Sequence, residues 1–253
     1  MKLQIAVAAH KPFPLPENPL YLPVQAGRAI HAPLDFTGDD TGDNISSRNE
    51  SFCELTVLYW AWKNLDADCI GLCHYRRYFA GKAFGKKQDR ILTSRQASEL
   101  METCEVILPN PRNYFIETNY SQYAHAHHGA DLDAARSVIA THHPEYLIAF
   151  DAVMRRSWGH RFNMCIMRRE VLDRYCSWLF DILFRLEARI DISGYSSYDR
   201  RVFGFLAERL LDVWLETEKP ACRHLGVIHT EGQNWPRKIL SFFWRKMKNI
   251  GKN

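Results

Sequence analysis

One short segment of the chain brings an imidazole, a phenol and two guanidinium groups next to one another. Residues 69–73 form an apolar run that ends abruptly in polar side chains. These side chains are His74, Tyr75, Arg76 and Arg77. Guanidinium groups bind phosphate oxygens through charge-assisted hydrogen bonds, and in α/β sheets ligands bind beyond the carboxyl ends of the strands. The segment therefore predicts a site for a phosphate-bearing ligand, in preference to a pair of solvated surface arginines.

A carboxylate in an apolar helix is the first candidate for acid–base chemistry. Glu208 lies in an expected helix, residues 198–215, in a largely apolar neighbourhood. Such a carboxylate either pairs with a cation such as Arg201 or has its pKa raised by desolvation. A structural ion pair and a catalytic role both fit the sequence. Asp199, near the start of the same helix, is the alternative base.

Acidic residues elsewhere suggest a divalent cation. Residues 66–68 match the Asp-x-Asp pattern that holds a cation against a diphosphate. That role requires acids at the carboxyl end of a strand, whereas these precede the apolar run, so we interpret them as a solvated turn. Asp43 and Asn44 precede an expected helix, where acids complement the helix dipole; they are also candidate ligands for ribose hydroxyls or a cation. Mn²⁺ or Mg²⁺ is therefore a candidate cofactor, although the sequence predicts no metal-ligand set.

A histidine cluster at residues 125–128 offers a different chemistry. On a helix, His125 and His128 would share a face while His127 would point elsewhere. The spacing does not match the ligand patterns of common metallohydrolases. We therefore favour a polar helix face, and a metallohydrolase that uses His125 and His128 stays an alternative.

The elements that would position these residues follow the order of a βαβ unit. Residues 3–8 form an expected buried strand, and residues 14–50 an irregular stretch with a weak strand at 21–26. A capping box at 47–50 predicts a helix that runs to Lys63, ahead of the apolar run. The order predicts an α/β fold with a mostly parallel central sheet flanked by helices. The remaining expected elements are helices at 94–101, 117–145 (in two pieces), 170–188 and 198–215, and strands at 105–108 and 162–167.

The charge distribution separates a nearly neutral body from a basic tail. Residues 237–253 contain six Lys or Arg and no acid, while the first 236 residues carry 27 basic and 29 acidic groups. A neutral body argues against nucleic-acid binding. With 253 residues, 46% of them hydrophobic, the chain is long enough for one large core. We expect one domain at 1–234 and a basic amphipathic tail at 235–253.

The tail and the rest of the chain predict a location in the cell. A helix at 235–253 would place aromatic anchors on one side and basic residues on the other, which suits anionic lipid headgroups; docking on the body is the competing interpretation. No window approaches the roughly 20 apolar residues that cross a bilayer, and the apolar start is too short for a signal peptide. The seven cysteines are typical of reduced core residues. We expect a cytoplasmic protein, peripheral on the inner face of the membrane.

Several longer motifs resemble one family of proteins. They are residues 9–12 (Ala-His-Lys-Pro), 44–46, 52–56, 59–64, 71–79 (Gly-Leu-Cys-His-Tyr-Arg-Arg-Tyr-Phe), 163–164, 166–167, and Arg201 with 204–210. The chain resembles, from Ile5 to about Trp214, bacterial capsular and exopolysaccharide glycosyltransferases, a family long labelled only as a domain of unknown function. The motif at 71–79 is long enough to be specific.

The resemblance implies a GT-A-like nucleotide-diphosphosugar fold and transfer of a sugar to a lipid-linked oligosaccharide at the inner membrane face. In some relatives that sugar is galactofuranose from its uridine diphosphate donor. By the resemblance, His10 and Lys11 flank the nucleotide, residues 74–77 replace the metal motif of the wider fold, and Asn163 faces the donor sugar or acceptor. We place His160 and Arg201 with Asn163 in that group.

Two classes of function follow. The first is a hexosyltransferase in which cations stabilise the departing nucleoside diphosphate while Glu208 or Asp199 deprotonates the acceptor hydroxyl. The second is a non-catalytic component of a polysaccharide assembly complex that binds a nucleotide or a carbohydrate.

Overall fold

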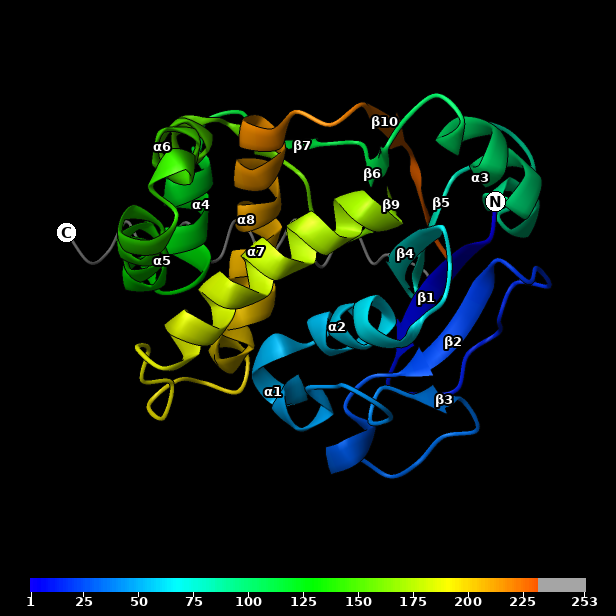
Figure 1. Cartoon of the computed structure of the whole chain (residues 1–253), viewed down its shortest axis with the longest axis horizontal. Helices are drawn as coiled ribbons and strands as arrows, with labels where there is room; N and C mark the ends of the chain where they lie inside the picture. Colours follow the sequence, from blue (N-terminus) through cyan, green and yellow to red (C-terminus); the bar gives the residue numbers. More distant parts are fainter. Residues whose placement is uncertain (232–253) are drawn as a thin grey trace.

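One large β-sheet forms the centre of residues 1–231, the part of the chain that this computed structural model describes (Figure 1). Seven of its nine strands lie side by side in the order β10 (Cys222–Leu225), β6 (Val106–Pro109), β9 (Cys165–Arg168), β4 (Cys69–His74), β1 (Leu3–Ala9), β2 (Tyr21–Gln25) and β3 (Thr37–Gly38). The other two are β5 (Arg77–Phe79), which pairs with β4, and β11 (Val227–His229), which pairs with β5. A separate pair is made by β7 (Arg112–Asn113) and β8 (Trp158–Gly159).

Four of the six neighbouring pairs in the row of seven strands are parallel, while β5 is antiparallel to both β4 and β11. The β1 strand pairs in parallel with both β2 and β4, β2 with β3, and β6 with β10. The β9 strand lies between β4 and β6 and is antiparallel to both. This confirms the predicted α/β fold with a mostly parallel sheet, and it places the carboxyl ends of β1 and β4 at the same edge.

The sheet separates two hydrophobic cores because alternate residues of a strand face opposite sides. In β1, Ala6 and Ala8 pack into the core formed with α2 (Leu55–Asn64), α7 (Arg169–Glu187) and α8 (Val202–Glu218). Ile5 and Val7 pack into the second core, to which α3 (Ser94–Met101) contributes. Both faces of the central strands are therefore buried, which explains why their sequences read as continuous apolar runs.

Three further helices extend the first core away from β1–β3. They are α4 (Asn119–Ala126), α5 (Gly129–His142) and α6 (Leu147–Arg155), and they lie at the opposite side of the molecule from β2 and β3 (Figure 1). The predicted helix in two pieces at 117–145 is thus confirmed. The structure also confirms the expected helices at 94–101, 170–188 and 198–215 and the weak strand at 21–26, with ends that differ by at most four residues.

The prediction of one continuous helix from the 47–50 capping box to Lys63 is wrong. The chain forms a short α1 (Asn49–Phe52) without a side-chain cap and restarts as α2, because Cys53 has φ 52° and ψ −129°. The side-chain amide of Asn49 donates to the Cys53 carbonyl (2.8 Å) and to Thr56 Oγ1 (3.0 Å), which offers the backbone an alternative to the helix ladder. The break turns Cys53 and Glu54 away from the helix path.

Two other sequence interpretations can be located. Asp66 and Asp68 precede β4, are exposed, and bind the Lys2 ammonium (3.1 Å) and the Lys2 backbone N–H (2.6 Å), which agrees with the interpretation of a solvated segment. Within residues 1–231, no helix has both the length and the apolar character that a membrane crossing requires. The tail predicted at 235–253 lies outside the described residues.

Candidate functional site

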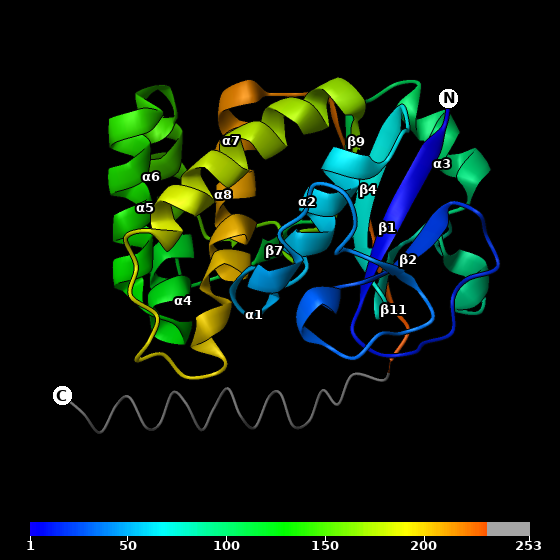
Figure 2. The same ribbon diagram turned by 60° about the horizontal axis from the view of Figure 1, so that its bottom comes forward.

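A cavity of about 820 Å³ opens at the carboxyl ends of β1 and β4. Its walls come from these strand ends, from β2 and the stretch after it, from the α1–α2 turn, and from the segment that joins α7 to α8. Figure 2 shows that segment, in yellow, on the same lower side as the carboxyl ends of the strands. The charged groups in the lining are Arg76, Arg200, Arg201, Glu50 and Glu54, and histidines add to the polar wall. This balance favours an anionic ligand.

Two histidines lie side by side at the strand ends. His10 follows β1 and His74 ends β4, with ring centres 6.3 Å apart, and both line the cavity. Burial, together with the charges of Arg77 and Arg76, lowers the pKa of His74 to about 3. Burial and the Arg76 charge also lower the pKa of His10. Both rings are therefore neutral near pH 7 and act as hydrogen-bonding groups rather than as cations.

Arg76 and Lys11 share an aromatic platform. The Arg76 guanidinium carbon lies 5.1 Å and the Lys11 ammonium 5.2 Å from the ring centre of Tyr75, which is itself buried. The Glu231 carboxylate binds Lys11 at 3.0 Å and lies 3.6 Å from Arg76. Lys11 and Arg76, two of the residues expected to bind the nucleotide, thus face the same exposed carboxylate, which a phosphate could replace. Nε of Arg76 has no hydrogen-bond partner.

Arg201 and the strained turn at Cys53 also line the cavity. Nε of Arg201 lies 3.2 Å from Sγ of Cys53. A non-glycine residue with φ 52° and ψ −129° costs of order 1–3 kcal/mol and persists only where its surroundings hold it, which is typical of functional sites. Burial raises the pKa of the Cys53 thiol to about 11, so it is not an activated nucleophile.

Glu54 is a cavity residue that the sequence did not reveal. Its Oε1 accepts a 2.8 Å hydrogen bond from Nδ2 of Asn163, which also donates to the Gly204 carbonyl at 3.0 Å. Burial raises the pKa of Glu54, while the Asn163 hydrogen bond works against that rise. The sequence held two signals, one acid inside the apolar segment at 52–58 and the family motif at 52–56, but the helical spacing of the neighbours concealed the break that exposes Glu54.

Glu208 lies away from the cavity lining and is fully engaged. Oε1 accepts the Phe162 backbone N–H at 2.9 Å, and Oε2 lies 3.3 Å from Arg161 and 3.4 Å from Arg209. Arg201, the partner considered from the sequence, binds elsewhere. Of the two roles that the sequence left open for Glu208, this geometry matches the structural ion pair.

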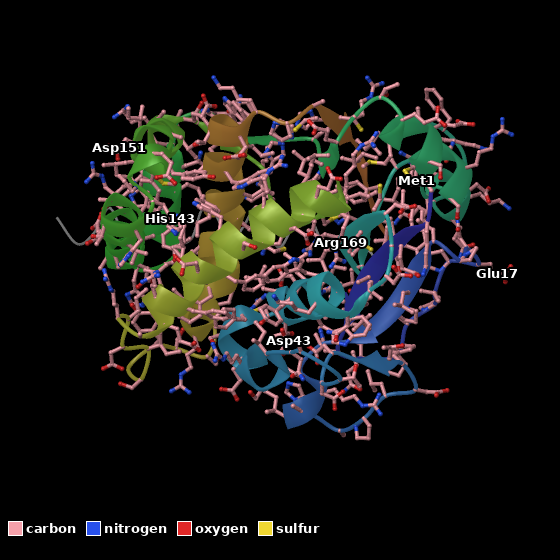
Figure 3. All side chains as sticks on the ribbon, viewed as in Figure 1. Met1, Glu17, Asp43, His143, Asp151 and Arg169 are labelled. Atoms are coloured by element: carbon pink, nitrogen blue, oxygen red, sulfur yellow. The ribbon has the colours of Figure 1, made fainter. Side chains whose placement is uncertain are left out.

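The other expected residues are dispersed. Asp199 accepts the Ser196 hydroxyl (2.7 Å), and Arg77 lies over the Phe162 ring at 4.2 Å. His160 is buried between Asp212 (2.5 Å) and His224 (3.0 Å). Asn44 bonds within its own turn. Asp43 accepts from the Tyr59 hydroxyl at 3.1 Å and lies below α2 in Figure 3. Of the thirteen expected site residues, the cavity lining contains His10, His74, Arg76 and Arg201.

The donor set of the cavity does not fit a divalent cation. The strand end that carries acids in metal-dependent sites carries His74 and Arg76 instead, and Glu54 is tied to Asn163. Among the described residues there is no group of three or more His, Cys, Asp or Glu side chains that could hold a metal. The histidines of the alternative site separate: His125 binds Glu117 at 2.7 Å and His128 stacks on Tyr195.

Comparisons with known proteins show which of them this chain resembles. The family model described as a domain of unknown function (DUF4422) matches residues 4–219. A search of curated proteins found no match. The solved apo structure of the WbbM bifunctional glycosyltransferase is similar to this chain, with a TM-score of 0.86, 28% sequence identity, and coverage of 92% of this chain but only 46% of that one. The chain therefore spans about half the length of that protein. Since the family model matches well over half of the chain, the protein belongs to the DUF4422 family.

Proposed function

We propose that this protein is a glycosyltransferase that moves a hexosyl unit from a nucleoside-diphosphate donor to a glycan acceptor. The first donor to consider is a uridine diphosphate sugar such as uridine diphosphate galactofuranose. The observation that carries the proposal is the cavity at the carboxyl ends of β1 and β4, which combines Arg76 with two neutral histidines. Its volume of about 820 Å³ is in the range of small-molecule and cofactor sites. The similarity to WbbM supports the reaction class.

Arg76 would provide electrostatic stabilisation of the leaving diphosphate. As the bond to the sugar breaks, negative charge develops on the diphosphate, and a preorganised guanidinium stabilises that charge. Nδ1 of His74 faces the Arg76 backbone N–H at 3.4 Å, which leaves the His74 Nε2–H free to donate to a phosphate oxygen. Lys11 would join Arg76 once a phosphate replaces the carboxylate of Glu231.

The proposal extends to the acceptor and to the location of the enzyme in the cell. A lipid-linked glycan in capsule, exopolysaccharide or O-antigen synthesis would place the enzyme on the inner face of the membrane. The basic composition of residues 235–253 supports such a contact with anionic lipid. Deleting residues 235–253 should therefore reduce binding to vesicles that contain anionic lipid. Unchanged vesicle binding would remove this part of the proposal.

A donor screen tests the function. Uridine, guanosine and cytidine diphosphate sugars, with and without manganese, are added to the full chain, and thermal stabilisation and diphosphate release with oligosaccharide acceptors are measured. We expect stabilisation by one nucleotide class and release of its diphosphate. Binding without turnover across the panel would favour the non-catalytic alternative, and no binding of any nucleotide would contradict both.

A further inference from the structure

We propose that the Glu54 carboxylate is the general base that takes the proton from the attacking hydroxyl, and that Asn163 holds it in place. The inference rests on the proposed function and names the residue at which the acceptor is activated. Glu54 is a carboxylate on the cavity wall, and it lies within hydrogen-bond distance of a buried amide rather than of a neutralising cation.

The backbone fixes the position of Glu54. The chain interrupts a helix at Cys53 to present Glu54 as the residue before α2, where its own carbonyl already starts the new helix. An uninterrupted helix from 49 to 64 would be the less strained conformation. The strain is therefore retained by a packing arrangement that fixes the carboxyl group in the wall of the cavity that His74 and Arg76 also line.

The Asn163 amide orients the carboxylate of Glu54. Asn163 is buried, has φ 51°, and directs one amide nitrogen to both Glu54 Oε1 and the Gly204 carbonyl. This anchors Oε1, while the carboxylate also accepts a hydrogen bond from its own backbone N–H, and no second side chain of the described residues occupies it. A base needs a carboxylate that is held in place and still accessible to the acceptor hydroxyl.

The other acids near the cavity are either solvated or occupied by other groups. Glu50 also lines the cavity but is exposed on α1, so water solvates its carboxylate. The oxygens of Glu208 are occupied by a backbone N–H and two guanidinium groups. Burial raises the pKa of Glu54, which makes its ionised form a stronger base than an ordinary carboxylate.

The step balances as a single displacement. The acceptor oxygen forms a bond to the anomeric carbon of the donor sugar while the bond from that carbon to the diphosphate oxygen breaks. The nucleoside diphosphate leaves with the electron pair of that bond. The acceptor proton passes to Oε2 of Glu54 and is then released to water.

Glu54→Gln tests the role because the amide still accepts the hydrogen bond from Asn163 but cannot take a proton. With the donor that turns over in the screen, we expect kcat to fall by at least about 100-fold, while the donor Kd measured by calorimetry changes by less than about threefold. The rise of kcat with pH on the acidic side should disappear. Glu50→Gln removes the same charge from the same cavity and is the electrostatic control, with an expected effect on kcat below about tenfold.

Asn163→Ala gives a second test that keeps Glu54. Because the Asn163 hydrogen bond lowers the pKa of Glu54, its removal should raise that pKa and move the acidic limb of the kcat profile to higher pH. A kcat of Glu54→Gln within about threefold of wild type, or an unmoved limb in Asn163→Ala, would overturn the proposal. A large loss of donor affinity in Glu54→Gln would also overturn it, because Glu54 would then bind the donor sugar. Failure of the wild-type protein to bind any nucleotide would contradict the proposed function itself.

Discussion

Two clusters of arginine and glutamate lie near the carboxyl edge of the sheet and differ in how their charges are used. In the cluster of Glu208, Arg161 and Arg209, both guanidinium groups share one carboxylate and also bind Oε1 of Gln122, at 2.9 Å from Arg161 and 2.5 Å from Arg209. In the cavity, Arg76 is 40% exposed and has one carboxylate, at 3.6 Å, whereas Arg161 and Arg209 are 19% and 2% exposed; Nε has no partner in any of the three arginines.

The difference separates structure from chemistry. A buried ion pair whose members already bond to each other has little capacity left for a ligand, and its worth appears when one partner is removed. A half-exposed cation on a cavity wall, whose one carboxylate lies 3.6 Å away, can instead form charge-assisted hydrogen bonds with a ligand. The first cluster should therefore respond to mutation through stability and the second through binding.

The largest expected effect is on stability, from Glu208→Gln. It removes the charged partner of Arg209, which is 2% exposed, and such a loss costs about 3 kcal/mol. For a chain of this size that corresponds to a Tm decrease of roughly 6–12 °C in thermal denaturation. Glu99→Gln, which removes an acid from an exposed pair with Arg95 on α3, is the control and should leave the Tm unchanged. An unaltered Tm in Glu208→Gln would show that the carboxylate is free for another role.

An intermediate effect is expected on binding, from Arg76→Ala. Loss of a charge-assisted contact to the diphosphate should weaken the affinity for a uridine diphosphate sugar by about 10- to 100-fold in calorimetry, with the Tm of the unliganded protein nearly unchanged. Arg95→Ala removes a cation from the distant α3 and should not alter the affinity. If Arg76→Ala binds the donor as tightly as wild type, the cavity cation has no part in recognition.

The smallest effect is expected from Glu231→Gln, which removes the carboxylate that Lys11 and Arg76 hold in the absence of a ligand. Donor affinity should rise by about two- to threefold, because the phosphate no longer competes with an exposed ion pair. Lys11 keeps the pKa of Glu231 below its ordinary value, so the gain should persist through the neutral pH range. A decrease in affinity would instead assign Glu231 to the bound state.

The sequence predicted the part of the site that depends on strand ends. An apolar run followed by His74 and Arg76 specifies a buried strand and the edge at which its polar residues emerge, so local pattern was enough. His10 after β1 was instead expected at the site from the family resemblance of residues 9–12. Parallel pairing of β1 with β4 then brings these residues together, as the structure confirms.

Glu54 and Glu208 could not be assigned in this way. Both are acids in apolar segments, and the pattern of a helix is the same whether an acid faces a cavity or an ion pair. The conformation of Cys53 that exposes Glu54 depends on hydrogen bonds from Asn49, and the partners of Glu208 come from residues 161–162, far away in the sequence. Tertiary contacts of this kind have no local signature.

The central claim is that a nucleoside diphosphate binds at the carboxyl ends of β1 and β4. A crystal structure of the protein with uridine diphosphate tests it most directly. We expect the diphosphate in the cavity, with phosphate oxygens within hydrogen-bond distance of the Arg76 guanidinium and close to His74 and His10. A nucleotide bound elsewhere, with no anion near Arg76, would contradict it.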